Sequence, residues 1–130
     1  MDAEFERKLK TRFDQLTELI NSPVVPLGEI ARAKALTARD RGVYAISLPG
    51  DPGTIVYVGR TKTKTVRGRI RDHLRIDGSF DLRGMLKRWP DLPQDAESYE
   101  ARWVAEPDDR ERGFRECFAI SMLTPKLNRP

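Results

Sequence analysis

Two short apolar segments on either side of a proline- and glycine-rich turn constrain the fold of this chain most strongly. Residues 43–48 and 54–58 are rich in apolar and β-branched side chains, and the sequence Pro-Gly-Asp-Pro-Gly at 49–53 separates them. Strands joined by so short a turn pair as an antiparallel hairpin. If Tyr44 and Tyr57 meet on one face of this hairpin, each places its ring in the core and its hydroxyl at the rim.

Helical periodicity of apolar residues accounts for most of the remaining chain. It predicts helices over 2–20, 27–36, 66–76, 80–89 and 108–124, while alternation predicts a third strand over 98–105. Residues 24–26 are interpreted as a connection only. The core stripe predicted for the last helix consists of Phe114, Cys117, Phe118 and Met122. The predicted fold is α/β of the α+β type, a small three-stranded antiparallel sheet flanked by helices.

A chain of 130 residues suits one core, which we divide into an N-terminal helical extension (1–40), packed on or beside the domain, and a main domain (41–130). The N-terminal helix packs within the chain or mediates a homodimer. No apolar run is long enough to span a membrane, and the N-terminus lacks the apolar segment of a signal peptide. The single cysteine, Cys117, suits a reducing compartment, so we expect a cytoplasmic protein.

Positive charge is concentrated in the middle of the chain. Residues 41–90 contain eleven basic and four acidic side chains, whereas residues 91–130 contain six basic and nine acidic ones. A local basic field of this kind favours a polyanion such as nucleic acid, although a solvated surface has the same composition. The cations that we expect to contact nucleic acid are Arg60, Lys62, Lys64, Arg67, Arg71 and Arg75.

The same region supplies the residue types that phosphodiester hydrolysis requires. An arginine can hold phosphate oxygens, one carboxylate can hold Mg²⁺, and a tyrosine assisted by a histidine can act on the attacking water. Arg69 and His73 are four residues apart and therefore neighbours on one helix face. Taken singly, each of these residues has an ordinary structural interpretation, so only their combination indicates a nuclease.

That combination resembles the GIY-YIG nuclease family. The two signatures correspond to Gly42-Val43-Tyr44 and Tyr57-Val58-Gly59. The helical arginine corresponds to Arg69, the histidine of the restriction-enzyme branch to His73, the metal-binding glutamate to Glu116 and the closing asparagine to Asn128. Arg67 competes with Arg69 for the arginine role, and Glu111 competes with Glu116 for the glutamate role.

The resemblance implies an endonuclease that hydrolyses DNA with one divalent ion, Mg²⁺ or Mn²⁺, held by Glu116. Tyr44 would orient or deprotonate the attacking water with the help of His73, and Tyr57 would hydrogen-bond near the scissile phosphate. Arg69 would stabilise the transition-state charge, and Asn128 would fix the C-terminal tail beside the site. The alternative is a non-catalytic module that binds nucleic acid or a partner protein on the same scaffold. An RNA substrate also stays open.

Overall fold

The computed structural model describes residues 2–33 and 38–128 of the chain. Its elements, in chain order, are α1 (Ala3–Ile20), β1 (Val25–Pro26), α2 (Leu27–Arg32), β2 (Gly42–Leu48), β3 (Asp51–Arg60), α3 (Val66–Arg75), α4 (Leu82–Lys87), β4 (Glu100–Ala105) and α5 (Asp109–Leu123). Short 3-10 turns occur at Ala96–Ser98 and Lys126–Asn128. The helix predicted over 27–36 ends at Arg32, and its residues 34–36 lie outside the described part.

The strands form one antiparallel sheet in the order β1-β4-β2-β3. The prediction of three strands was one short, because β1 adds a fourth by pairing Val25 with Ala101 and Pro26 with Glu100. A two-residue segment is too short to show any periodicity, and proline is tolerated at the edge of a sheet. The antiparallel α+β architecture is as predicted, with this additional edge strand.

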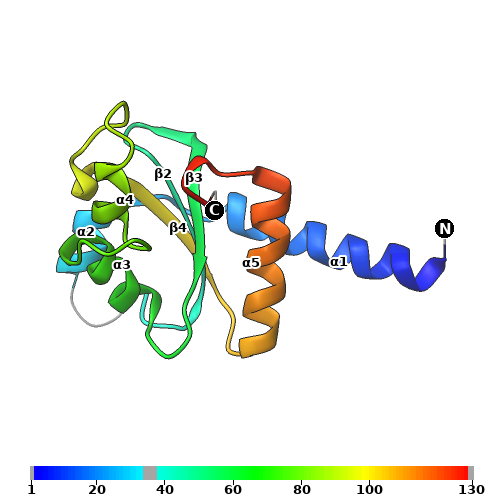
Figure 1. Ribbon diagram of the computed structural model, residues 1–130. Coiled ribbons are helices and arrows are strands. Elements are labelled where there is room, and N and C mark those ends of the chain that lie inside the picture. The colour runs from blue at the N-terminus through cyan, green and yellow to red at the C-terminus, as the bar shows by residue number, and fades with distance from the viewer. Residues whose placement is uncertain (1, 34–37, 129–130) are drawn as a thin grey trace.

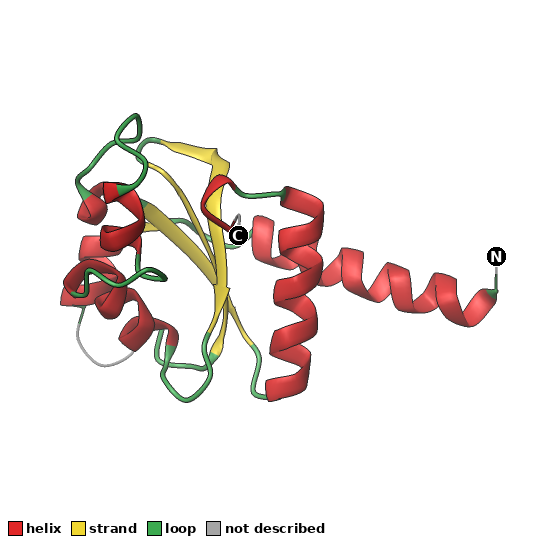
Figure 2. Cartoon of the chain, in the orientation of Figure 1, coloured by secondary structure: helices red, strands yellow, loops and turns green. Residues whose placement is uncertain are grey.

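Helices cover both faces of the sheet (Figures 1 and 2). On one face, Tyr44 and Ile46 of β2 share a buried core with residues of α2, α3 and α4, including Ile30, Ile70 and Leu86. On the other face, Val43 and Ala45 pack with residues of α1 and α5, including Leu19 and Ala119. Side chains that alternate along β2 therefore serve two separate hydrophobic layers. None of the described helices is long and apolar enough to cross a bilayer.

The core stripe predicted for α5 was on the wrong side of the helix. Phe114 and Met122 are 43% and 49% exposed and Cys117 is also exposed, whereas Ala119 is buried against the sheet. Phe118 packs edge-to-face on Phe13 of α1, with ring centroids 5.3 Å apart. Phe118 of the predicted stripe thus contacts α1, which the sequence pattern alone could not distinguish from contact with the sheet.

Helix α1 packs on the domain only through its C-terminal part. Leu16 and Leu19 contribute to the core between the sheet and α5, while the N-terminal half projects away from the domain (Figure 1). Phe5 in this half is 53% exposed. The homodimer through this helix stays a prediction. By contrast, β1 and α2, which also belong to the predicted extension, contribute to the sheet and to its main core.

Candidate active site

The two tyrosine signatures face each other across β2 and β3. Tyr44 pairs with Gly59 in the sheet register, and the rings of Tyr44 and Tyr57 lie on one face with centroids 6.2 Å apart. A Cβ atom on Gly59 would lie 2.5 Å from the Tyr44 hydroxyl oxygen and 2.9 Å from a ring carbon of Tyr57. Glycine is therefore required at this position because the phenol of the opposite strand occupies the space of its side chain.

The glycine of the first signature is required for a different contact. A Cβ atom on Gly42 would lie 2.0 Å from the carbonyl oxygen of Val104 in the neighbouring strand. Gly42 also exchanges hydrogen bonds with Thr61, whose hydroxyl accepts the Gly42 N–H at 3.0 Å and whose own N–H donates to the Gly42 carbonyl. These contacts anchor the start of the basic loop that follows β3.

His73 lies behind Tyr44 and is completely buried. Its Nε2 atom is 2.7 Å from the Tyr44 hydroxyl, and its Nδ1 atom accepts the backbone N–H of Leu82 at 2.8 Å. Burial, together with the charge of Arg69, holds the pKa of His73 well below its ordinary value. The ring is therefore neutral, and because Nδ1 is an acceptor, its proton resides on Nε2 and is donated to Tyr44.

Both phenols are protonated at neutral pH. Burial raises the pKa of Tyr44 well above its ordinary value, the proximity of Tyr57 adds to the effect, and the charge of Arg69 opposes it. Burial likewise raises the pKa of Tyr57, again opposed by Arg69. The buried hydroxyls thus favour their neutral forms, in which each can donate and accept hydrogen bonds.

Arg69 is held in a fixed orientation beside the two tyrosines. One guanidinium nitrogen lies 2.5 Å from the carboxylate of Asp81, and another donates to the Phe80 carbonyl at 2.7 Å. Asp72, one turn further along α3, lies 3.9 Å from the same guanidinium. Thr65 caps the N-terminus of α3, because its hydroxyl accepts the Gly68 N–H at 3.0 Å.

Glu116 of α5 approaches the tyrosines from the other side of β3. Its carboxylate accepts a hydrogen bond of 3.2 Å from Nε of Arg60, whose NH1 also lies 3.8 Å from Asp109. Burial raises the pKa of Glu116, and the charge of Arg60 opposes this shift. Arg60 therefore supplies the positive charge that compensates a half-buried carboxylate.

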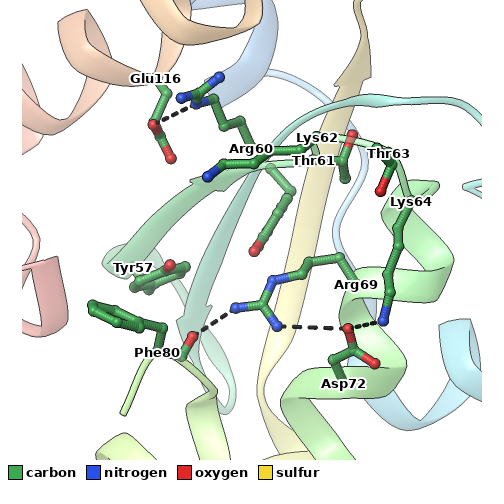
Figure 3. Close-up of a pocket in the computed structure, with 11 residues that line it drawn as sticks. Tyr57, Arg60, Thr61, Lys62, Thr63, Lys64, Arg69, Asp72, Phe80 and Glu116 are labelled. Carbon is green, nitrogen blue, oxygen red and sulfur yellow. Dashed lines mark hydrogen bonds and ion pairs between the residues drawn. The ribbon is translucent and has the colours of Figure 1, made fainter. Parts of the chain in front are cut away.

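These side chains surround one open cleft of about 520 Å³ (Figure 3). Its lining combines two phenols, four cations, two carboxylates, two threonines and one phenylalanine: Tyr44, Tyr57, Arg60, Thr61, Lys62, Thr63, Lys64, Arg69, Asp72, Phe80 and Glu116. The cleft thus brings together residues from β2, β3, α3 and α5 and the loops that follow β3 and α3. His73 lies behind the lining, hydrogen-bonded to Tyr44.

Some predicted site residues lie elsewhere. Arg67 and Arg71 do not line the cleft; they donate to backbone carbonyls of α2 at Ile30 and Ala31, at 3.3 and 3.1 Å. Arg75 is exposed at the end of α3. Of the two competing arginines, Arg69 lines the cleft and Arg67 does not. Of the two competing glutamates, Glu116 lines the cleft, whereas Glu111 forms an ion pair of 2.7 Å with Arg12 of α1.

Asn128 is a clamp on the edge strand and does not line the cleft. Its side-chain oxygen accepts the Val58 N–H at 2.8 Å, and its side-chain nitrogen donates to the Val58 carbonyl at 2.9 Å. The chain after α5 is thereby tied to β3 at the residue between Tyr57 and Gly59. This contact resembles one rung of a sheet ladder, and it holds the second signature in place.

Several residues that shape the site were not predicted from the sequence. Phe80 and Asp81 were predicted as the first residues of a helix over 80–89, but α4 spans only Leu82–Lys87, so both lie in the loop before it. Arg112 of α5 is 1% exposed and donates hydrogen bonds to the carbonyls of Thr61, Lys62, Glu106 and Pro107. An arginine amid other charged residues predicts an exposed side chain, so only the tertiary contact with the loop after β3 reveals this role.

The donor set in the cleft suits a magnesium ion only if most ligands come from outside the protein. The described residues contain no group of three or more histidine, cysteine or acidic side chains that could hold a metal. Asp72 is paired with Lys64 at 2.5 Å, which leaves Glu116 as the carboxylate on the tyrosine side of the cleft. Mg²⁺ commonly binds through one or two carboxylates together with water and substrate phosphate oxygens, so Glu116 fits such a site.

Comparison with known proteins supports the fold. No family model and no curated protein sequence matches the chain. The crystal structure of the GIY-YIG N-terminal endonuclease domain of UvrC from Thermotoga maritima, bound to magnesium, matches with a TM-score of 0.52 and 22% identity, over 78% of this chain and 92% of that domain. A point mutant of the same domain matches with a TM-score of 0.53, 20% identity and the same coverage. The chain therefore has the fold of the GIY-YIG nuclease domains.

Proposed function

We propose that this protein is a metal-dependent endonuclease that hydrolyses phosphodiester bonds in DNA. The observation that carries the proposal is the convergence of Tyr44, Tyr57, Arg69 and Glu116 on one cleft, although up to 72 positions separate them in sequence. The fold of the UvrC domains, which bind a catalytic divalent cation, supports the same conclusion. The basic residues of the cleft, Arg60, Lys62 and Lys64, suit a phosphate backbone.

In this proposal, Arg69 holds the scissile phosphate. Its guanidinium is fixed by Asp81 and the Phe80 carbonyl, so no side-chain freedom has to be lost when substrate binds. Its positive charge lies close to both phenols and opposes the rise of their pKa values. A preoriented cation at this position stabilises the additional negative charge that develops on the phosphate in the transition state.

Tyr44 positions the attacking water as a neutral phenol. The hydroxyl oxygen of Tyr44 accepts a hydrogen bond from His73 Nε2–H, so its own O–H is directed away from His73. His73 therefore acts as a fixed donor that orients Tyr44, and it also stabilises the phenolate whenever Tyr44 loses its proton. Tyr57 lies on the same face and offers a second hydroxyl to the phosphate or the water.

Glu116 would hold the divalent ion, Mg²⁺ or Mn²⁺, together with water and phosphate oxygens. When bound, such an ion supplies positive charge that stabilises a leaving oxygen. In this structure, Nε of Arg60 donates a hydrogen bond of 3.2 Å to one oxygen of the Glu116 carboxylate. An ion at Glu116 would therefore either bind the other carboxylate oxygen or displace the Arg60 hydrogen bond, and a displaced guanidinium is then free to contact the DNA backbone.

Cleavage assays on single-stranded, double-stranded and branched DNA with Mg²⁺ or Mn²⁺ test the proposal. We expect metal-dependent products that are lost in Arg69→Ala and Glu116→Gln and retained in Arg7→Ala, which removes an exposed charge on α1. Removal of one electrostatic stabiliser typically reduces the rate by about 10²–10³. DNA binding without any metal-dependent product would overturn the proposal and support the non-catalytic module. Products from RNA alone would reassign the substrate.

A further inference from the structure

Phe80 is the most exposed of the large hydrophobic side chains that the structure describes. It is 77% exposed, and it nevertheless lines the cleft together with Tyr57 and Arg69 (Figure 3). A phenylalanine at such a position has an unfavourable contact with water over most of its ring. The folding of the domain does not explain this exposure, because the ring is outside both hydrophobic cores.

The loop that carries Phe80 is held rigidly at four consecutive residues. The carbonyl of Ser79 accepts from Arg88 at 2.7 Å, and the carbonyl of Phe80 accepts from Arg69 at 2.7 Å. The carboxylate of Asp81 is bound to Arg69, and the N–H of Leu82 donates to His73. The exposed ring is therefore presented from a fixed backbone, and two of the residues that fix it are the arginine and histidine of the proposed active site.

The position of the Phe80 ring suits the binding of single-stranded nucleic acid. Proteins bind unpaired strands by combining cations that follow the backbone with aromatic rings on which bases stack. Here, Lys62, Lys64 and Arg60 line the cleft, and Phe80 lies on the same lining. A base inside a continuous duplex is already covered on both faces by its neighbours, so the ring can stack only on a base that is unpaired, extruded or terminal.

We propose that Phe80 stacks on an unpaired nucleobase adjacent to the scissile phosphate, and that the preferred substrate is DNA with unpaired nucleotides at the cleavage point. This inference rests on the proposed nuclease function. Because Arg69 binds both the Phe80 carbonyl and, in that proposal, the phosphate, the distance between the stacked base and the reacting phosphate is fixed by one side chain. Cleavage position and base stacking are thereby coupled.

Fluorescence of 2-aminopurine, which stacking quenches, tests the inference without catalysis. The Glu116→Gln variant, in chelator, is titrated into a single strand, a bulged duplex and a continuous duplex that each carry the probe base. We expect quenching and tighter binding for the first two, and a loss of affinity of roughly 10-fold or more when Phe80→Leu is added, since Leu keeps apolar bulk but lacks an aromatic face. Phe80→Trp should retain the quenching.

The matched control is Phe114→Leu, which alters an exposed phenylalanine of α5 and should leave binding unchanged. Equal affinity for all three DNAs, or no effect of Phe80→Leu, would overturn the stacking role and indicate that the ring serves another contact, such as a protein partner. The outcome is separable from the nuclease proposal: quenching without cleavage by the unmodified protein leaves stacking intact, whereas cleavage of continuous duplex that is insensitive to Phe80→Leu refutes stacking alone.

Discussion

The hydroxyl oxygen of Tyr44 lies 2.7 Å from Nε2 of His73, and the other nitrogen of the same ring accepts the backbone N–H of Leu82. From the sequence, we expect His73 to help Tyr44 orient or deprotonate the attacking water. The Leu82 contact assigns a different role, because a neutral ring whose Nδ1 accepts must donate from Nε2. His73 is thus a fixed hydrogen-bond donor to the tyrosine of the first signature.

This assignment predicts how stability depends on pH. Burial holds the pKa of folded His73 well below its ordinary value, whereas the unfolded chain takes up a proton as pH falls through about 6.5. The His73 contribution is therefore fully present above about pH 6.5 and is lost below it, by up to about 1.4 kcal/mol per pH unit. Urea denaturation at pH 5 and pH 7.5 should show a larger acid-induced loss in the unmodified protein than in His73→Gln. Equal losses would contradict the neutral, buried ring.

The contact between Gly59 and Tyr44 predicts a steric effect. In Gly59→Ala, the new methyl group would lie 2.5 Å from the Tyr44 hydroxyl, so the phenol or the strand must move. Such overpacking typically costs about 1–3 kcal/mol, and here it also displaces Tyr44 from His73. Chemical denaturation and DNA cleavage should both be impaired. Gly53→Ala near the start of β3, where the nearest atom lies 3.7 Å from the new methyl group, is the control that should retain both.

The hydrogen bonds of buried Arg112 lead us to expect that its replacement destabilises the wall of the cleft. Its guanidinium donates to four backbone carbonyls, two of which belong to Thr61 and Lys62 in the cleft wall. Arg112→Met leaves these carbonyls without their donor and should lower the free energy of unfolding by on the order of 3 kcal/mol. Arg110→Met, an exposed change on the same helix, should have little effect. Similar stabilities for the two variants in urea denaturation would show that the hydrogen bonds of Arg112 do not stabilise the fold.

The pair of Arg60 and Glu116 makes a prediction about metal binding. Arg60 donates to Glu116 at 3.2 Å, so it competes with any divalent cation for this carboxylate. Binding of Mn²⁺, followed by electron paramagnetic resonance without DNA, should tighten in Arg60→Gln and disappear in Glu116→Gln. Arg75→Gln and Glu111→Gln are the charge-matched controls outside the cleft. Unchanged Mn²⁺ binding in Glu116→Gln would exclude Glu116 as the ligand.

The sequence predicted those parts of the molecule that depend on local patterns. The hairpin of β2 and β3, the third strand β4 and the helix with Arg69 and His73 follow from alternation, turn residues and helical spacing. The strand β1 could not be predicted in this way, because a segment of two residues is too short to show an alternating pattern. The orientation of α5 could not be predicted either, since its apolar stripe could equally face α1 or the sheet. Ala119, a small residue with a weak apolar signal, is the buried one.

For the candidate site as well, the sequence predicted some residues and missed others. Tyr44, Tyr57, Arg69 and Glu116 were predicted as site residues because their types and order resemble those of a known family, and all four line one cleft. The cations Arg67 and Arg71 could not be distinguished from cleft residues by charge, because only the packing of α2 on α3 shows that they bind its carbonyls. Phe80 and Asp81 were predicted inside the helix over 80–89, and only the structure shows that they lie in the loop between α3 and α4.

The most direct test of the account is the cleavage of DNA by the unmodified protein and by Arg69→Ala, with Mg²⁺ or Mn²⁺ and with chelator. We predict that products form only with a divalent ion, and that Arg69→Ala, with an unchanged circular dichroism spectrum, cleaves about 10²–10³ more slowly than the unmodified protein. Undiminished cleavage by a folded Arg69→Ala variant, or products formed equally well in chelator, would contradict it.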